Sequence, residues 1–400
     1  MKRYGWLLGC CLFLSIGMLW AADEPDLRML QQKAAQSRDM EGYVGVCKYL
    51  YQTEENPELL LLYADSIHQL ATKSKKPEQL VEYYIWASEG NFIKGDFQQG
   101  YALKRKAIAL AEKAGLKFAI SQSCCDMGYY CNVDARYDSA RYYFRKGLEA
   151  GEDLSEAGEA CRTMLTNYAS SFLFEGKTDS ALVYTIRASE RSAADKDTAM
   201  LIENLNQLGT IYRRKKNLEN CIANFEQALH LCELRGNHNA VAFIYGNIAT
   251  AYCDWNRPVD AIPFSEKAVE YALKTGNKRR IGTCYVNLGA IQIRLVQMRA
   301  EGIATLLKAI PILEEVNDRR LLCDAYNYLV NAYRMDGNLN QAMYYLQKLD
   351  KLAHEMQTDA ERFRYYQAKA GLLQESKNYT EAIVYYRRMI DMLRSGYKDT

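Results

Sequence analysis

The sequence predicts an all-α protein built as an α-solenoid of about eight helical hairpins. A spacing of small and aromatic residues recurs about every 40 residues, which is typical of a repeat array. Within each copy the recurring residues lie three or four positions apart, as on one face of an α-helix. Only 6 prolines occur in the 400 residues, and no Gly/Ser-rich or Pro-rich linker interrupts the chain. A chain of this kind acts through a surface rather than through a deep cleft.

The first residues, MKRYGWLLGCCLFLSIGMLWAADEP, place Lys2 and Arg3 before an apolar run that ends at Ala22. This order predicts a secretory signal peptide at residues 1–22, with small residues at its end for cleavage. An uncleaved N-terminal anchor is the alternative, because about 19 apolar residues can span a bilayer. In both cases the cations stay inside, so the rest of the chain is expected outside the cytoplasm, either periplasmic or secreted.

The mature chain is expected to be electrically neutral. The whole sequence has 51 Lys and Arg against 49 Asp and Glu, and loss of Lys2 and Arg3 leaves 49 of each sign. Neither nucleic acid nor an anionic membrane is therefore an implied partner. Membrane attachment is expected only through an uncleaved N-terminal segment or through a span outside this chain.

A degenerate helical lead-in is expected at residues 26–80, followed by the repeat array at 81–400. The clearest copy runs through Gly209, Tyr212, Cys221, Phe225 and Ala228. Its small residues let the two helices of a hairpin approach closely, and its aromatic residues fill the space between successive hairpins. We call the first small residue of each copy the marker. The markers are Ser88, Gly128, Ala169, Gly209, Ala249, Gly289, Val330 and Ala370.

Polar turns separate the expected helices, as in KKNLEN at 215–220 and MDGNLNQ at 335–341. Asn, Asp and Gly end one helix and start the next. Some copies depart from the pattern, with Lys104 and Ser265 where an apolar residue is expected. Pro263 and Pro311 fall inside expected second helices, and we expect them to kink these helices or to delay their start.

The cysteines are expected to be packing residues rather than a disulfide framework. Ten of the 12 cysteines follow the signal segment, and most occupy positions where a helical repeat needs a small apolar residue. Cys124 and Cys125 are adjacent on an expected helix, where a bridge would distort the peptide. No pair of CxxC motifs is present, so we expect no structural zinc site.

The stretch LNQLGTIYRRKKNLENCIANFEQAL, at 205–229, resembles the tetratricopeptide repeat family, as does YNYLVNAYRMDGNLNQAMYYLQKL at 326–349. The resemblance covers roughly residues 81–400 and implies a right-handed superhelix whose first helices line a concave groove. The units have about 40 residues rather than the usual 34. Long units of this kind look like those in the sensing arms of bacterial signalling regulators.

Catalytic chemistry is not expected, and we expect neither a metal site nor a cofactor. The chain has only 4 histidines, and none belongs to HExxH. The phosphate-binding and nucleophile motifs GxGxxG, GxxxxGK[ST] and GxSxG are absent from the sequence.

The resemblance places the binding groove on the first helix of each repeat. We assigned to it the residues three before, one after and four after the marker, because these positions share one helical stripe. Around Gly209 these are Asn206, Thr210 and Arg213; around Val330 they are Asn327, Asn331 and Arg334. Each set combines amides or a hydroxyl with a cation, which suits an extended peptide or an acidic terminus. Ordinary solvated helix faces are the alternative.

The expected function is that of an extracytoplasmic scaffold that binds a protein or peptide through the groove of a tetratricopeptide solenoid. The alternative is the sensory input arm of a membrane-bound transcriptional regulator or histidine kinase whose output module is not in this chain.

Overall fold

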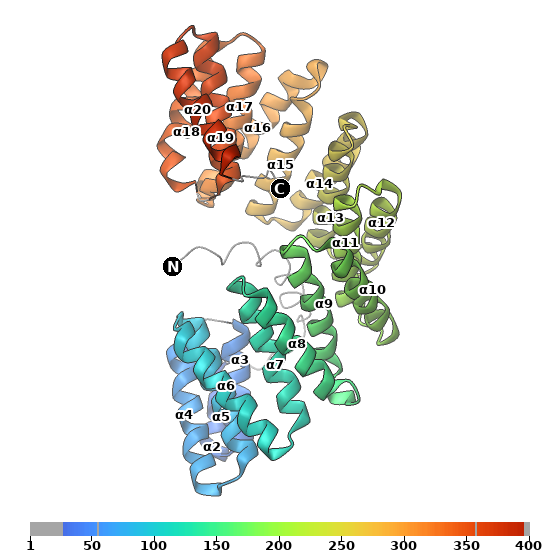
Figure 1. Cartoon of the computed structure of the whole chain (residues 1–400), viewed down its shortest axis with the longest axis vertical. Helices are drawn as coiled ribbons and strands as arrows, with labels where there is room; N and C mark the ends of the chain where they lie inside the picture. Colours follow the sequence, from blue (N-terminus) through green and yellow to red (C-terminus); the bar gives the residue numbers. More distant parts are fainter. Residues whose placement is uncertain (1–26, 54–55, 357, 396–400) are drawn as a thin grey trace. The chain divides into compact units, whose positions relative to one another are not determined.

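The structure, a computed structural model, describes residues 27–53, 56–356 and 358–395. The expected signal segment at 1–22 lies outside these ranges. The described residues contain 19 α-helices and no strands (Figure 1), which confirms the all-α prediction. Consecutive helices pack as antiparallel pairs, as expected for a solenoid of helical hairpins. Among the described residues, no helix combines the length and the apolar character needed to cross a membrane.

The chain forms two compact units, Met1–Lys215 and Lys216–Thr400, called unit 1 and unit 2 below. The helices of unit 1 are α2 (Leu27–Ser37), α3 (Met40–Thr53), α4 (Pro57–Ser74), α5 (Pro77–Lys94), α6 (Phe97–Ala114), α7 (Lys117–Val133), α8 (Tyr137–Gly151), α9 (Gly158–Phe174), α10 (Thr178–Ala194) and α11 (Thr198–Arg214). Those of unit 2 are α12 (Leu218–Leu234), α13 (His238–Asp254), α14 (Pro258–Thr275), α15 (Lys278–Gln292), α16 (Arg299–Glu315), α17 (Arg319–Met335), α18 (Leu339–Leu352), α19 (Asp359–Glu375) and α20 (Tyr379–Arg394).

The repeat has the predicted period. We call the odd-numbered helices from α5 to α19 the A helices and the even-numbered helices from α6 to α20 the B helices. Successive A helices begin 40 or 41 residues apart, from Pro77 to Asp359, and every marker lies on an A helix. The helices α2, α3 and α4 precede this array and fall in the region expected to be a helical lead-in. Neighbouring A helices of one unit also touch, as α13, α15, α17 and α19 do in sequence.

The turns follow from local backbone chemistry. Most of them contain one residue with positive φ, such as Gly95, Gly236 or Gly337, because a helix that ends on a left-handed residue can satisfy its last carbonyl groups. Asn or Asp then caps many of the next helices. For example, the side chain of Asn338 accepts a hydrogen bond from the backbone N–H of Gln341 (3.2 Å) at the start of α18.

Small residues sit where the helices of a hairpin approach most closely. A methyl group added at Gly289 on α15 would lie 2.6 Å from Cγ of Leu306 on α16. One added at Gly128 on α7 would overlap the ring of Phe144 on α8. The role predicted for the small markers is therefore confirmed at these two positions.

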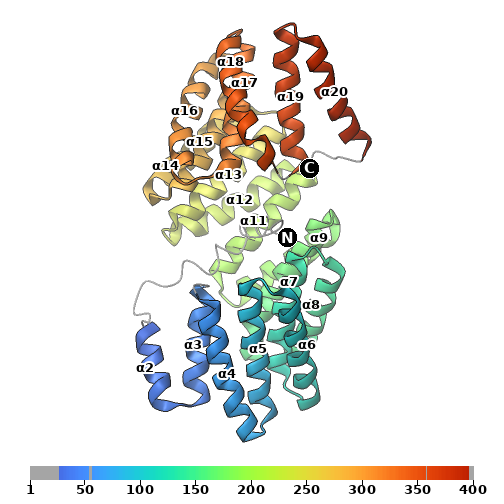
Figure 2. The same ribbon diagram turned by 90° about the vertical axis from the view of Figure 1, so that its left-hand side faces the viewer.

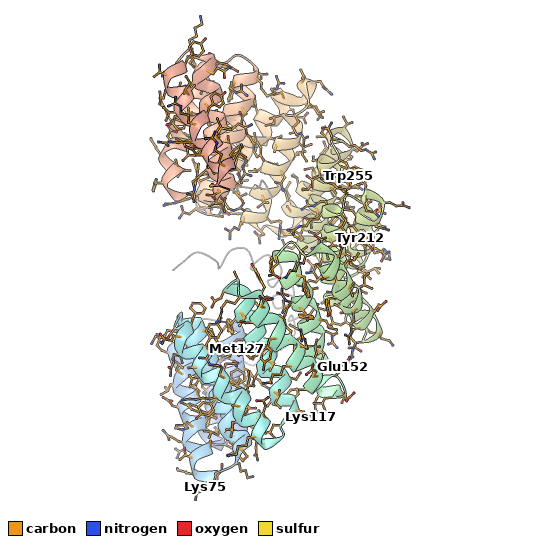
Figure 3. All side chains as sticks on the ribbon, in the orientation of Figure 1. Lys75, Lys117, Met127, Glu152, Tyr212 and Trp255 are labelled. Atoms are coloured by element: carbon orange, nitrogen blue, oxygen red, sulfur yellow. The ribbon has the colours of Figure 1, made fainter. Side chains whose placement is uncertain are left out.

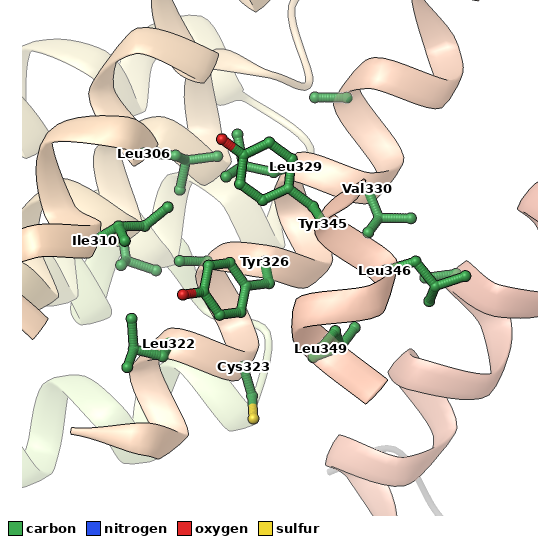
Figure 4. Close-up of a cluster of buried hydrophobic side chains, with 14 of the residues drawn as sticks. Leu306, Ile310, Leu322, Cys323, Tyr326, Leu329, Val330, Tyr345, Leu346 and Leu349 are labelled. Atoms are coloured by element: carbon green, nitrogen blue, oxygen red, sulfur yellow. The ribbon is translucent and has the colours of Figure 1, made fainter. Parts of the chain in front are cut away.

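The larger apolar side chains fill the space between hairpins. In unit 2, Leu306 of α16 and Leu329 of α17 are fully buried in one cluster with Leu349 of α18 (Figure 4). In unit 1, Met127 of α7 is buried among the helices (Figure 3). Pro263 and Pro311 lie inside α14 and α16, which begin upstream of them. The expected delay of these helix starts is therefore wrong.

Candidate ligand-binding surface on the A helices

The six predicted groove residues belong to two A helices, one in each unit. On α17 of unit 2, Asn327 is only 7% exposed, and the amide of Asn331 donates a hydrogen bond to the carbonyl oxygen of Asn327 (3.1 Å). Arg334 forms an ion pair with Glu375 of α19, with 2.6 Å between Nη1 and Oε1. Asn327 therefore faces the interior, and Arg334 connects two successive A helices.

The three predicted residues on α11 of unit 1 are half-buried. The hydroxyl of Thr210 donates a hydrogen bond to the carbonyl oxygen of Asn206 (3.1 Å), one turn earlier on the helix, and Arg213 follows on the next turn. The structure therefore keeps these side chains on one helix face, as the spacing predicts, but solvent reaches them only in part.

On α17, Arg334 of the predicted stripe is half-buried, as are Asp324 and Tyr328. A second set of accessible residues on this helix lies six and two positions before the marker and one and five after it, and it shares with the predicted stripe the position directly after the marker. In unit 2 we call these residues the A-helix surface. They are Phe243, Asn247, Thr250 and Asp254 on α13; Thr283, Asn287 and Ala290 on α15, with Arg294 directly beyond it; Asp324, Tyr328, Asn331 and Met335 on α17; and Arg364, Ala368, Gly371 and Glu375 on α19. All except Ala368 are exposed or half-buried.

Side chains connect the A-helix surface from one helix to the next. The guanidinium group of Arg280 on α15 stacks over the ring of Phe243 on α13, 5.2 Å from its centroid. Arg364 on α19 donates a hydrogen bond to the carboxylate of Asp324 on α17 (3.1 Å). Arg320, one turn before Asp324, lies 3.8 Å from the same carboxylate. Side chains thus connect α13 with α15 and α17 with α19, and α15 also contacts α17.

The A-helix surface carries two arginines, Arg294 and Arg364, and three acidic residues, Asp254, Asp324 and Glu375. Burial raises the pKa of the Asp324 carboxyl, and Arg364 and Arg320 oppose that rise. Burial also raises the pKa of Tyr328, and the neighbouring charge of Asp324 adds to the effect. Arg294 is exposed, and no carboxylate in the described part of the chain pairs with it. Its guanidinium group contacts the thiol of Cys253, and its remaining N–H groups can take a carboxylate from a ligand.

The A helices of unit 1 instead bond their polar groups to one another. Lys104 on α6 is completely buried and pairs with Glu89 on α5 and with Asp126 on α7 (2.9 Å). The hydroxyl of Tyr130 donates a hydrogen bond to Glu89 (2.7 Å). The departure of Lys104 from the repeat pattern thus reflects an internal ion network. The signal that could have revealed it is a lysine four residues after Gly100, the small residue of the B helix α6, with acids on both neighbouring A helices.

Further along unit 1, amide and hydroxyl groups close the same face. The hydroxyl of Thr166 on α9 bonds to the amide oxygen of Asn204 on α11 (2.9 Å). The amide of Gln207 donates a hydrogen bond to Ser170 (2.7 Å). These hydrogen bonds connect α9 to α11 within unit 1.

The described residues show no arrangement that suggests catalysis by a metal. Within them, no group of three or more His, Cys, Asp or Glu side chains could hold a metal ion. Two of the histidines contact tyrosines: His68 stacks on Tyr83 with ring centroids 4.3 Å apart, and His238 lies 5.7 Å from Tyr271.

Comparison with known proteins agrees with this architecture. Residues 199–274 match the family model described as tetratricopeptide repeat. No curated protein sequence matches the chain. The chain is thus a helical repeat protein of the solenoid class. By sequence, residues 199–274 resemble tetratricopeptide repeats, and the neighbouring hairpins repeat the same helical arrangement.

Three solved structures illustrate the shared fold. The apo form of the quorum sensor NprR from B. thuringiensis is 16% identical, with a TM-score of 0.53 over 81% of this chain and 92% of that one. A Rap protein complexed with Competence and Sporulation Factor is 10% identical, with a TM-score of 0.50 over 92% and 98%. A signal transduction ATPase with a tetratricopeptide repeat sensor, PH0952 from Pyrococcus horikoshii, is 17% identical, with a TM-score of 0.53 over 82% and 52%.

Proposed function

We propose that this protein is a non-catalytic scaffold that binds a protein or peptide in an extended conformation through the A-helix surface of unit 2. The observation that carries the proposal is the band of accessible polar groups across α13, α15, α17 and α19. The solved structures with this fold include a Rap protein in complex with Competence and Sporulation Factor.

Arg294 suits an acidic side chain of a peptide, because two of the acidic residues of the surface, Asp324 and Glu375, are already paired with Arg364 and Arg334. Asn287 is exposed and Asn331 is half-buried, and a side-chain amide can both donate to and accept from a peptide backbone. Arg294 adds a guanidinium group, which pairs with a carboxylate in bidentate fashion. Asp324, by contrast, is already paired with Arg364, so it repels an acidic ligand less than a free carboxylate does.

Selection of peptides from a random library on the purified protein tests this proposal. We expect enrichment of Asp and Glu, and binding that falls at least about tenfold when Asn287, Arg294 and Asn331 are all replaced by Ala. The matched control replaces Gln227, Lys308 and Gln347, which are exposed on B helices of unit 2, and it should bind as the parent does. Equal affinity of the A-helix variant and the parent, or enrichment of basic peptides, contradicts the proposal.

We further propose that the protein acts outside the cytoplasm. The support is the order of residues 1–22, with two cations before an apolar run that ends in small residues. Cell fractionation should find the protein outside the cytoplasm, and N-terminal sequencing should find a start near residue 23. An intact Met1 on a membrane-bound protein would identify the uncleaved anchor, and an intact Met1 on cytoplasmic protein contradicts the proposal.

The sensory-arm alternative has one specific observation in its favour. Two of the solved structures with this fold are described as a quorum sensor and as a protein with a tetratricopeptide repeat sensor. This alternative predicts that the cellular protein carries a membrane span and an output module on the same polypeptide. Immunoblotting with an antibody against the repeat array would then detect a product longer than 400 residues, whereas a shorter product excludes it.

A further inference from the structure

The last helix, α20, exposes an apolar stripe. Ala382 is its only buried residue among those described. Six large apolar side chains are exposed instead. One is Val384, and the other five recur at intervals of four, three, four and three residues: Tyr379, Ile383, Tyr386, Ile390 and Leu393. This spacing places them on one side of the helix, as in the contact seam of a helix pair. Figure 2 shows α20 at the edge of unit 2, beside α19.

The corresponding residues of an earlier B helix are buried between the A helix of their own hairpin and the next A helix. On α16, Leu306 and Leu313 lie four and eleven residues after the small residue Gly302, and both are fully buried in the cluster shared with α17 (Figure 4). The same positions on α20 are Tyr386 and Leu393, counted from Ala382, and they are 37% and 54% exposed. The surface of α20 therefore has the residue types and spacing that receive an amphipathic helix elsewhere in this array.

The charges beside the stripe select the kind of helix that fits. Arg387 and Arg394 each come directly after a stripe residue, so they lie seven residues apart on one flank. Both are exposed, and no carboxylate in the described ranges is paired with either. Asp391 lies between them, which leaves this flank with one net positive charge. Acidic residues on an incoming helix would therefore be attracted.

A second copy of the chain fits this surface less well. In an antiparallel pair of α20 helices centred on Tyr386, each Arg387 meets the Arg387 of the other copy, and like charges at that distance repel. The exposed residues of α2, the first described helix, include Lys33 and the polar Gln32 and Gln36. A head-to-tail pair would thus place another cation and polar groups against the apolar stripe.

We propose that α20 is a docking site for an amphipathic helix of a partner protein, with apolar residues spaced as in an A helix and acidic residues beside them. This interaction is separate from the A-helix surface, because it uses a different helix and a helical rather than an extended ligand. It holds or fails independently of the function proposed above.

Binding of designed helical peptides to the full chain tests the proposal. Three peptides have the apolar residues through which α17 packs on α16, and lactam bridges hold them helical. They differ only at the two positions that face Arg387 and Arg394, which carry Glu, Gln or Lys. Measured by fluorescence anisotropy, the Glu peptide should bind about tenfold more tightly than the Lys peptide, with the Gln peptide between them. Ile390→Asp should abolish binding of all three.

Two further variants separate charge selection from general adhesion. Replacing both Arg387 and Arg394 by Glu should reverse the order of the Glu and Lys peptides. Val259→Asp, at an exposed apolar residue of α14, should leave binding unchanged, and circular dichroism should show that every variant is folded. The proposal is overturned if the peptides do not bind, or if Ile390→Asp leaves their binding unchanged. It is also overturned if the order of the peptide affinities is the same in the Arg387 and Arg394 double variant as in the parent. It is also overturned by sedimentation equilibrium showing a dimer that Ile390→Asp dissociates, because the occupant would then be a second copy.

Discussion

Glycine at a marker position sets how closely the two helices of a hairpin approach. At Gly289 the nearest atoms to an added methyl group include Cγ of the fully buried Leu306 and the backbone oxygen of Gly302, the latter at 3.1 Å. The oxygen belongs to the main chain of α16 and cannot rotate away. A larger residue therefore forces the two helices apart.

Gly289→Ala should destabilise the protein by about 1 to 3 kcal/mol, because the gain in helix propensity is smaller than the cost of overpacking. The matched control is Gly246→Ala on α13, where nothing lies within 4 Å of the added methyl group, and where we expect stabilisation of about 0.5 to 1 kcal/mol. Thermal unfolding followed by circular dichroism measures both. Equal effects of the two substitutions would show that packing at the marker is not close.

Lys104→Met should destabilise unit 1 by about 3 kcal/mol, because it leaves the buried carboxylate of Glu89 without its cation. Lys106→Met, at an exposed residue of the same helix, should change the stability by less than about 0.5 kcal/mol. Urea denaturation at pH 7 measures the difference. A Lys104 variant as stable as the Lys106 variant would contradict a structural role for the ion network.

The deficit of Lys104→Met should shrink as the pH falls from 7 towards 4.5. Burial already raises the pKa of the Glu89 carboxyl above its ordinary value of 4.5, and Lys104 opposes that rise, so loss of the lysine raises this pKa further. A carboxyl with a raised pKa in the folded state takes up its proton before the unfolded chain does, so stability increases as the pH falls through this range. Urea midpoints of the variant and the parent at pH 7 and pH 5 test the sign, and a deficit that grows on acidification is the opposite result.

At the scale of the helix, the ends of the A helices connect one repeat to the next. Asp318 caps α17 by accepting a hydrogen bond from the backbone N–H of Leu321 (3.1 Å), and it also pairs with Arg279 of α15 (2.7 Å). In unit 1, Asp197 caps α11 and pairs with Arg162 of α9 (2.9 Å). One carboxylate thus both starts a helix and holds it to the preceding A helix.

Pro311→Ala should stabilise α16 by about 1 kcal/mol or more, because alanine restores a backbone donor to the Leu307 carbonyl group and removes the ring from the helix interior. Pro258→Ala is the matched control, since Pro258 is at the start of α14, where proline costs little. It should leave stability unchanged or slightly lower. Melting temperatures of the two variants measure the difference, and a loss of stability in Pro311→Ala would mean that proline at this position is needed for packing.

At the scale of the whole molecule, the described cysteines form no disulfides. All ten are thiols without a disulfide bond, and all except Cys253 are buried. Burial raises the pKa of several of these thiols, for example that of Cys47 to about 12, which keeps them in the unreactive protonated form at neutral pH. They act as small apolar residues of the core, as their positions in the repeat predict.

A thiol reagent should therefore react slowly with the native protein and fully after unfolding without reductant. We expect all ten described cysteines to be modified in urea, with Cys253 the first to react under native conditions. Mass spectrometry of the alkylated protein counts the modified sites. Fewer than ten sites would reveal disulfide bonds, and rapid reaction of buried thiols in the native protein would show that the repeats open readily.

The sequence by itself determined the repeat, its period and the positions of its small residues. These depend on helical periodicity and on side-chain volume, which are local properties, and Gly128 and Gly289 lie at the close approaches that their spacing predicts. The role of turn residues such as Asn338 could also be predicted, because a capping side chain bonds to a backbone group within three residues of itself. The tertiary structure alone decided which polar residues face solvent.

Whether a polar residue faces solvent depends on neighbouring helices that lie about 40 residues away in the sequence. Asn327 and Arg334 share a helical stripe with Asn331, as predicted, yet α19 takes Arg334 into an ion pair through Glu375 and packing leaves Asn327 buried. Lys104 likewise looked like a defect in the repeat until α5 and α7 brought Glu89 and Asp126 to it. A helix pattern specifies which residues share a face, whereas the contacts of that face depend on how successive helices pack.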